Sequence, residues 1–156
     1  MMLIYPACFY LDNDGYTVVF PDLNYLSTDG KTLEQAMEHA IDCLAGYLYL
    51  ETKENHKLPK PTTLNNVDPN KIEKEMHFKI KSKESFTNLI SVDLDSYAKE
   101  HFEIAVKKTL TIPAWLNMLA IQNNINFSKV LQEALENKLR GKIYENKFEK
   151  KIISNH

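Results

Sequence analysis

The segment Val106-Lys107-Lys108-Thr109-Leu110-Thr111-Ile112-Pro113 decides how this chain is organised. Its polar and apolar residues alternate, which is the pattern of a strand whose successive side chains point to opposite faces. One face is apolar, and the other carries Lys107, Thr109 and Thr111. Pro113 ends the strand and suits the first position of a helix, because its fixed φ is close to the helical value. The segment therefore predicts a short strand that leads directly into a helix.

Two helices are expected after this strand. The first covers about residues 113–123, and the second runs from an N-cap at Ser128 to Arg140, where it either stops near Gly141 or continues through Lys151. One short strand and two helices are too small to fold alone. They make sense as half of an intertwined dimer, in which two copies of the strand pair into a ribbon that enters the major groove of DNA.

Such a ribbon would place particular side chains against DNA. Lysine donates hydrogen bonds to guanine acceptors, and threonine bonds a base edge or touches a thymine methyl, so the expected groove residues are Lys107, Thr109 and Thr111. The second helix is expected to begin at Asn126, Phe127 and Ser128. The unpaired backbone N–H groups of this helix start are expected to bind a DNA phosphate.

The apolar face of the strand is expected to seal the ribbon against the helices below it. The predicted dimer core consists of Leu110, Ile112, Trp115, Leu116, Leu131 and Leu135. For Trp115, stacking on a base is the second possibility. The alternative for the whole segment is an edge strand in an ordinary α+β core, with Lys107 and Lys108 protecting the edge.

The net charge of −2 hides a division along the chain. Residues 1–105 hold 10 Lys/Arg and 17 Asp/Glu, giving −7, whereas residues 106–156 hold 9 Lys/Arg and 4 Asp/Glu, giving +5. An acidic N-terminal part and a basic C-terminal part suggest two partners of opposite charge, with nucleic acid bound by the basic C-terminal part. A solvated helix face is the plainer explanation of the basic excess.

The front of the chain reads as a sheet with one long helix. Strands are expected at residues 3–11, 16–20, 26–28 and 86–94, with a turn at 12–15. The helix is expected at 33–51, capped by Thr32 and Gln35 in a capping box. Its buried stripe is predicted to be Leu33, Ala36, Met37, Ala40, Ile41, Leu44 and Leu48.

The remaining stretches complete this division. The polar residues 62–85 are expected to form a mobile connection or an irregular surface loop, and residues 95–102 a short helix. The predicted domains are therefore 1–102 and 103–156. Cys8 and Cys43 are expected to be buried thiols of a reducing compartment, with a disulfide between them as the alternative. The chain shows no leader and no apolar run long enough to span a bilayer, so a cytoplasmic protein is expected.

The chemistry-bearing residues do not predict an enzyme. Carboxylates near the front could hold a divalent metal for phosphoryl chemistry, namely Asp12, Asp14, Asp22, Asp29 and Glu34. Most of them stand in turns, where aspartate is favoured for its local hydrogen bonds, and an acidic surface can also dock a basic partner. Histidine and cysteine spacings match no zinc motif, and there is no glycine-rich phosphate loop. Neither a metal nor a cofactor is expected.

The order of the parts resembles the HicB family of antitoxins. At the front, the resemblance is carried by Tyr5-Pro6-Ala7, by Asp14-Gly15-Tyr16-Thr17-Val18-Val19-Phe20-Pro21-Asp22-Leu23, by Gly30-Lys31-Thr32-Leu33-Glu34-Gln35-Ala36 and by Leu58-Pro59-Lys60-Pro61. Further along, Lys107-Lys108-Thr109-Leu110-Thr111-Ile112-Pro113 and Asn126-Phe127-Ser128 are similar to the ribbon-helix-helix module that some HicB proteins carry.

The resemblance implies an α+β protein with a reduced ribonuclease H-like domain followed by a ribbon-helix-helix domain. It implies a non-enzymatic antitoxin whose front domain binds HicA, a small basic mRNA interferase, and blocks its catalytic histidine. The back domain would bind the operator of its own operon as a homodimer, and front-domain association could give a tetramer. The expected toxin-binding residues are Asp12, Asp14, Tyr16, Asp22 and Tyr25.

One turn departs from the family pattern. The usual Pro-Gly-Cys after the Asp-Leu pair is replaced by Asn24-Tyr25-Leu26, so a different backbone shape is expected there. Two other functions stay open on the sequence alone. One is a metal-dependent ribonuclease H-like nuclease that uses the front carboxylates, and the other is a DNA-binding regulator whose front domain senses a small molecule.

Overall fold

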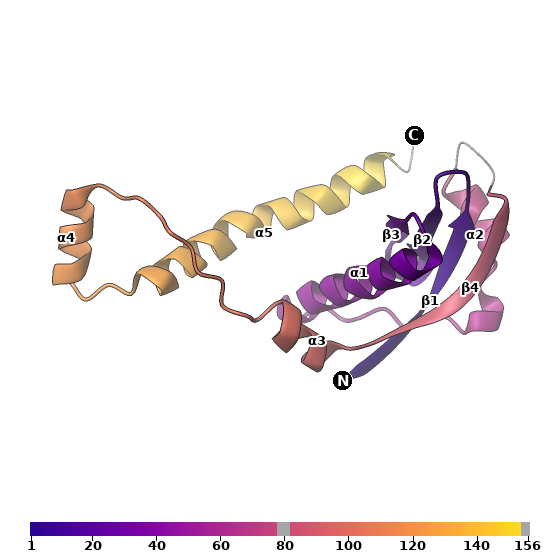
Figure 1. The fold of residues 1–156 in the computed structure, drawn as a ribbon, viewed down its shortest axis with the longest axis horizontal. Helices are drawn as coiled ribbons and strands as arrows, with labels where there is room; N and C mark the ends of the chain where they lie inside the picture. Colours follow the sequence, from indigo (N-terminus) through magenta and orange to yellow (C-terminus); the bar gives the residue numbers. More distant parts are fainter. Residues whose placement is uncertain (78–81, 154–156) are drawn as a thin grey trace. The chain divides into compact units, whose positions relative to one another are not determined.

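The computed structural model describes residues 1–77 and 82–153, with side chains described up to residue 140. Within this range the chain divides into two compact units, Met1–Ala105 and Val106–His156, which we call unit 1 and unit 2. Unit 1 is a mixed α+β unit, and the described part of unit 2 is helical (Figure 1).

Unit 1 is built on a four-stranded antiparallel sheet in the order β3-β2-β1-β4. Its strands are β1 (Met2–Leu11), β2 (Tyr16–Phe20), β3 (Leu26–Gly30) and β4 (Glu84–Asp93). The three expected front strands are confirmed. The fourth begins two residues earlier than expected and ends before Leu94, which opens the next helix. All ten residues of β4 pair with β1.

One face of the sheet is covered by α1 (Leu33–Lys53). The predicted N-cap is confirmed, because the Thr32 hydroxyl accepts from the Gln35 N–H at 3.2 Å; the reciprocal bond of the capping box is shifted by one residue, since the Gln35 side chain accepts from the N–H of Lys31, before the cap, at 2.8 Å. The helix packs on Tyr5, Phe9 and Phe20. Its fully buried apolar residues are Ala36, Ala40, Leu44, Ala45 and Leu48.

The predicted stripe is wrong at its first member. Leu33 is 39% exposed, because the first turn of α1 extends beyond the buried part of the stripe, which begins at Ala36. Met37 and Ile41 are half-buried and pack against the core, as expected. The helix also runs two residues past the expected end, to Lys53.

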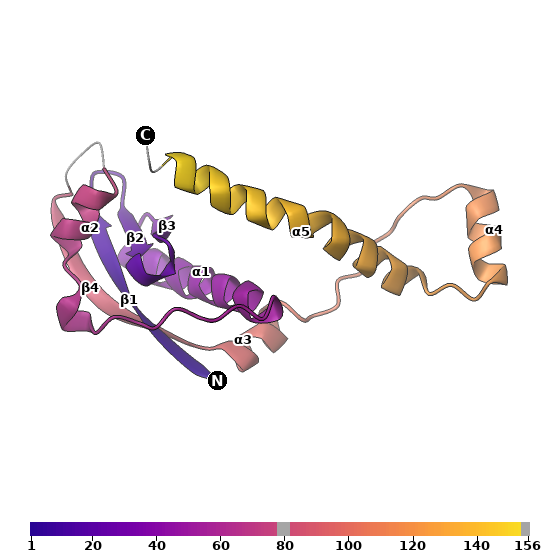
Figure 2. The same ribbon diagram turned by 180° about the vertical axis from the view of Figure 1, so that it is seen from behind.

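The opposite face of the sheet carries a smaller cluster formed by Cys8, Tyr10, Val19 and Ile72. Ile72 belongs to α2 (Pro69–Glu75), which lies behind the sheet in Figure 1 and in front of it in Figure 2. The Tyr10 hydroxyl donates to the Pro69 carbonyl at 2.8 Å and ties the helix to the sheet. Of the two cysteines expected to be buried thiols, Cys8 is buried, whereas Cys43 is only half-buried.

The prediction of an irregular connection over 62–85 is therefore wrong for much of its length. The segment contains a short 3-10 turn, η2 (Leu64–Asn66), as well as α2, and residues 78–81 lie outside the described range. The helix forms because the Asp68 carboxylate accepts from the Asn70 N–H at 2.9 Å and Pro69 occupies the first helical position. Ile72 anchors the helix to the sheet, and Val67 and Met76 on either side of the helix pack against the same cluster.

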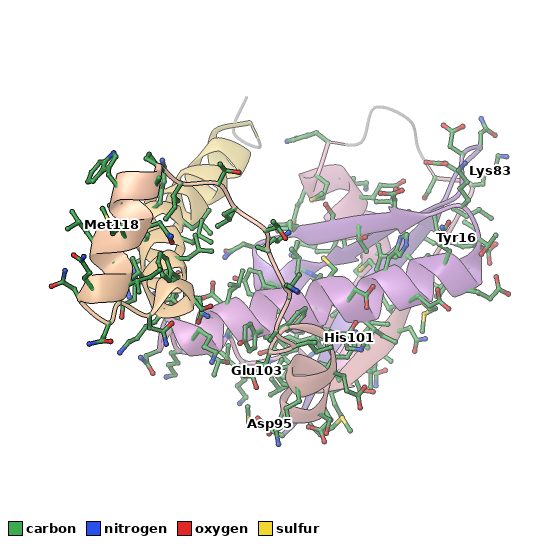
Figure 3. All side chains as sticks on the ribbon, turned by 60° about the vertical axis from the view of Figure 1, so that its left-hand side comes forward. Tyr16, Lys83, Asp95, His101, Glu103 and Met118 are labelled. Atoms are coloured by element: carbon green, nitrogen blue, oxygen red, sulfur yellow. The ribbon has the colours of Figure 1, made fainter. Side chains whose placement is uncertain are left out.

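A short helix, α3 (Leu94–His101), follows β4 as expected and packs against α1. Tyr97 of α3 is half-buried, and its hydroxyl donates a hydrogen bond to the Asp42 carboxylate of α1. Its burial, together with this carboxylate, raises the pKa of Tyr97 to about 12. Asp95 and His101 of α3, and Glu103 just beyond it, are marked in Figure 3.

Unit 2 contains the two expected helices, α4 (Ala114–Gln122) and α5 (Phe127–Ile153). The second continues past Gly141, which is one of the two expected outcomes. Residues 105–113 form no strand within a single chain. A strand requires a hydrogen-bonded neighbour, and the predicted neighbour is the same segment of a second copy. The ribbon therefore stays a prediction.

Candidate functional site

The five front residues expected to bind a partner fall into two groups. Asp12, Asp14 and Tyr16 lie at the turn that opens β2, whereas Asp22 and Tyr25 follow the end of that strand. Figure 3 shows Tyr16 at the same end of the sheet as Lys83, whose N–H donates to the Leu11 carbonyl at 2.8 Å. The structure therefore does not bring the five residues together into one site.

The first group is shaped by the turn itself. The Asp12 carboxylate accepts from the Asp14 N–H at 2.7 Å, and the Asp12 N–H donates to the Gly15 carbonyl at 3.0 Å. Asp12 is thus used to hold the turn, which is the role that sequence reasoning gave to such aspartates. Asp14 is exposed, while Tyr16 is half-buried and packs against the core. Asp14 is the residue of this group best presented to a partner.

Asp22 is fully engaged within unit 1. One of its carboxylate oxygens accepts from the Thr62 N–H at 2.8 Å, and the other accepts from the Thr62 hydroxyl at 2.7 Å. The two residues are 40 positions apart in the chain, so this pair fastens the segment after α1 to the end of β2. The structure assigns Asp22 a structural contact that the sequence does not reveal.

We expect Asp22→Ala to lower the free energy of unfolding by about 2–3 kcal/mol, because it removes two hydrogen bonds to a charged acceptor. Thr62→Val keeps one of the two and should cost about half as much. Urea unfolding of the full chain, followed by circular dichroism, gives both values. Asp14→Ala is the matched control, and an equal loss in that variant would contradict a special role for Asp22.

Tyr25 stands in the turn that departs from the expected family pattern. Asn24 and Tyr25 both adopt the left-handed conformation, with φ of 55° and 56°. This backbone directs the Tyr25 hydroxyl to the Glu75 carboxylate of α2, to which it donates at 2.7 Å. The hydrogen bond raises the pKa of Tyr25. Tyr25 as a whole remains 40% exposed.

A shallow cleft of about 200 Å³ lies beside this second group. Its lining is acidic on balance, since three carboxylates face a single lysine, Lys71, which pairs with Glu75 at 3.9 Å. The lining residues are Pro21, Asp22, Thr62, Asn66, Val67, Asp68, Lys71, Ile72 and Glu75. Sequence reasoning missed Asp68 and Glu75, although the pair Asp68-Pro69 is a helix-start signal.

The expected DNA-contacting residues of unit 2 lie on two exposed segments. Lys107, Thr109 and Thr111 are exposed along the stretch 105–113. The second helix begins at Phe127, and the Asn126 side chain accepts from the Lys129 N–H at 3.0 Å. Asn126 is therefore the N-cap, and the prediction that Ser128 caps the helix is wrong by two residues. The helix start still falls within the predicted Asn126-Phe127-Ser128 segment.

The predicted dimer-core residues are largely uncovered in a single chain. Among residues 106–140 no side chain is buried, and only Ala120 and Leu131 are half-buried. The exposed fractions of the other core candidates are 63% for Leu110, 40% for Ile112, 61% for Trp115, 41% for Leu116 and 50% for Leu135. A soluble unit rarely exposes so much apolar surface unless another surface covers it.

Metal and membrane chemistry receive no support from the described residues. Within 1–77 and 82–153, no three histidine, cysteine or carboxylate side chains come together in a way that could hold a metal ion. No helix in that same part of the chain is long and apolar enough to cross a membrane.

Comparison with known proteins agrees with the order of these parts. The family model described as the HicB-like antitoxin of bacterial toxin–antitoxin systems matches residues 5–135. A chain of a solved toxin–antitoxin complex from Streptococcus pneumoniae is 30% identical with a TM-score of 0.62, over 88% of this chain and 99% of that one. An uncharacterised 14.9 kDa protein of Haemophilus phage HP1 is 28% identical over 114 residues, 73% of this chain and 76% of that protein.

A more distant likeness is to the antitoxin HicB of Burkholderia pseudomallei, at 16% identity and a TM-score of 0.47, over 85% of this chain and 96% of that one. That similarity is too low to bear on individual residues. The family match extends across unit 1 and far into unit 2, ending within α5. The chain therefore belongs to the HicB-like antitoxin family of bacterial toxin–antitoxin systems.

Proposed function

We propose that this chain neutralises a HicA-type mRNA interferase toxin through unit 1 and represses its own operon through a ribbon-helix-helix dimer formed by unit 2. The observation that carries the proposal is that one family match spans both units, residues 5–135. The similar chain from Streptococcus pneumoniae comes from a toxin–antitoxin complex, which supports a toxin partner. Both proposed partners, an mRNA-cleaving toxin and the operator DNA, are in the cytoplasm, so we propose that this chain acts there.

The charges of the two units match the two proposed partners. Residues 1–105 carry −7, and their acidic turn and cleft suit a basic toxin. Residues 106–156 carry +5, which suits the phosphates of an operator. On unit 1 we propose Asp14 and Tyr25 as the leading toxin contacts, because both are exposed. Asp12, Tyr16 and Asp22 act chiefly by shaping the surface around them.

Unit 2 favours a dimer because its apolar residues lack cover. In the proposed ribbon, two copies of residues 106–112 pair, so that Leu110 and Ile112 turn to the helices while Lys107, Thr109 and Thr111 turn to DNA. Trp115, Leu116, Leu131 and Leu135 complete the shared core. The start of α5 at Asn126, Phe127 and Ser128 then clamps a phosphate through its backbone N–H groups.

A nuclease is the weaker alternative. Metal-assisted hydrolysis needs carboxylates that converge on one ion. Here Asp12 and Asp14 lie at one end of β2, whereas Asp22 lies beyond the other end with both oxygens bonded to Thr62. The described geometry of unit 1 gives this alternative no support.

We expect Lys107→Ala combined with Thr109→Ala to weaken operator binding at least about tenfold, because each change removes a groove contact from both subunits. Toxin neutralisation should survive, since unit 1 is untouched. Gel-shift titration with the upstream promoter fragment and a growth-rescue assay with the co-expressed toxin measure the two activities.

Lys99→Ala, which removes an equal charge from α3 of unit 1, is the control for operator binding. Loss of toxin neutralisation by the Lys107/Thr109 variant, with its circular dichroism unchanged, would contradict the separation of the two activities. Unchanged operator binding would contradict the ribbon itself.

A further inference from the structure

The turn between β2 and β3 holds a tyrosine in a conformation that tyrosine rarely adopts. Asn24 and Tyr25 both lie in the left-handed region, with φ of 55° and 56°. Asparagine is tolerated there, but a bulky side chain is an outlier. Glycine would close the same turn without this strain. Backbone strain of this kind is found at binding sites, where the surrounding structure holds one side chain in place. Tyr25 is therefore a candidate for a side chain that is retained for its contacts.

The strained turn is tied to both helical layers of unit 1. The Asn24 amide donates a hydrogen bond to the Tyr47 hydroxyl of α1 at 3.3 Å. The Tyr25 hydroxyl donates to the Glu75 carboxylate of α2 at 2.7 Å, across 50 positions of the chain. The orientation of Tyr25 is thus determined by a tertiary contact with α2 and not by the turn alone.

The helix α2 keeps its place without Tyr25. The Tyr10 hydroxyl donates to the Pro69 carbonyl at the start of the helix at 2.8 Å. Ile72, in the middle of the helix, packs into the smaller cluster on this face of the sheet. Glu75 follows less than one turn later and is therefore a fixed acceptor. The dependence runs in one direction, since the helix positions the tyrosine.

Tyr25 is also presented to a partner. It is 40% exposed although its hydroxyl is bonded. Tyrosine is one of the residues that most often dominate the binding energy of protein interfaces, and a side chain that is already held in place loses little conformational entropy on binding. Glu75 also lines the shallow acidic cleft, so the tyrosine is held beside a surface that suits a basic toxin.

We propose that Glu75 is a positioning residue for toxin binding, because its carboxylate holds Tyr25 in the orientation in which the tyrosine contacts the toxin. The strain at Tyr25 is retained for that contact. The inference rests on the proposed function, in which Tyr25 is a toxin contact, and adds α2 as the element that determines the geometry of the contact.

Tyr25→Gly distinguishes a binding role from a folding role. Surface plasmon resonance of the full chain, with an inactive variant of the toxin encoded in the same operon as the immobilised probe, measures affinity. Urea unfolding followed by circular dichroism measures stability. We expect toxin binding to weaken at least about thirtyfold, because a central tyrosine is lost. The urea midpoint should stay unchanged or rise, because glycine relieves the left-handed strain. Natural affinity with a lowered midpoint would overturn the proposal.

A double-mutant cycle tests the contact between the two side chains. Tyr25→Phe and Glu75→Ala should each weaken toxin binding about tenfold, because each removes one partner of the same hydrogen bond. The double variant should be no more than about twofold weaker than either single variant. Glu75→Gln should bind within about threefold of the natural sequence, since its amide oxygen still accepts from the tyrosine hydroxyl.

Glu38→Ala is the matched control, because it removes an equal charge from an exposed position of α1. It should bind the toxin like the natural sequence. Effects of Tyr25→Phe and Glu75→Ala that simply add would overturn the positioning role, and so would a Glu75→Gln variant as weak as Glu75→Ala. A natural sequence that does not bind the toxin would instead contradict the proposed function, so the two failures are distinguishable.

Discussion

Leu135→Asp should convert the proposed dimer of the full chain into a monomer and reduce operator binding by more than about a hundredfold. Leu135 is 50% exposed in a single chain and lies on the stripe of α5 that is predicted to form the dimer core. Burying a leucine contributes about 1.5–3 kcal/mol, and each dimer buries two copies of this residue. The substitution also forces two carboxylates into an apolar interface, where an unpaired charge is costly.

Light scattering after size exclusion measures the mass, and gel-shift titration measures operator binding. Leu50→Asp is the matched control, because Leu50 is 45% exposed on α1 of unit 1 and is outside the proposed dimer. That variant should remain dimeric and bind the operator normally. Leu135→Asp should still neutralise the toxin if unit 1 acts independently. A dimeric Leu135→Asp variant with full operator binding would refute the predicted core.

The sheet and the long helix of unit 1 could be predicted because their signals are local. Alternating residues over 3–11 and 16–20, a turn with Gly15, and Thr32 with Gln35 each act within a few positions. The helix α2 gives a weak local signal because its stretch is polar and its apolar contacts with the sheet, made by Ile72 with Val67 and Met76 beside it, do not recur at helical spacing.

The site was harder to predict than the fold. The sequence shows that Asp22 is an aspartate after a strand, but it cannot show that Thr62, 40 positions later, occupies both of its oxygens. Nor can it show that the Tyr25 hydroxyl reaches Glu75, because that contact depends on a left-handed turn and on the unpredicted helix α2. Contacts between residues distant in the chain are set by tertiary packing, which local patterns do not encode.

Gly30→Ala should be among the most damaging single substitutions in unit 1, with a loss of about 3 kcal/mol in the free energy of unfolding. The sequence marks Gly30 only as a turn residue, but the structure shows a close approach between two backbones. A Cβ at this position would lie 2.4 Å from the Ala36 nitrogen and 2.7 Å from its Cα. The Ala36 N–H is fixed by its bond to the Thr32 carbonyl at 2.9 Å, so the first turn of α1 cannot yield locally.

The end of β3 and the start of α1 would therefore have to separate, which loosens the packing of Ala36 and Ala40 on the sheet. Gly46→Ala is the matched control, since a Cβ there meets nothing within 4 Å and the residue lies inside α1. It should stabilise the protein by about 0.5–1 kcal/mol, because alanine favours the helix. The urea midpoint of unfolding, measured by circular dichroism, should therefore fall for Gly30→Ala and rise for Gly46→Ala. Equal shifts would mean that backbone freedom, and not the close approach to α1, is what Gly30 supplies.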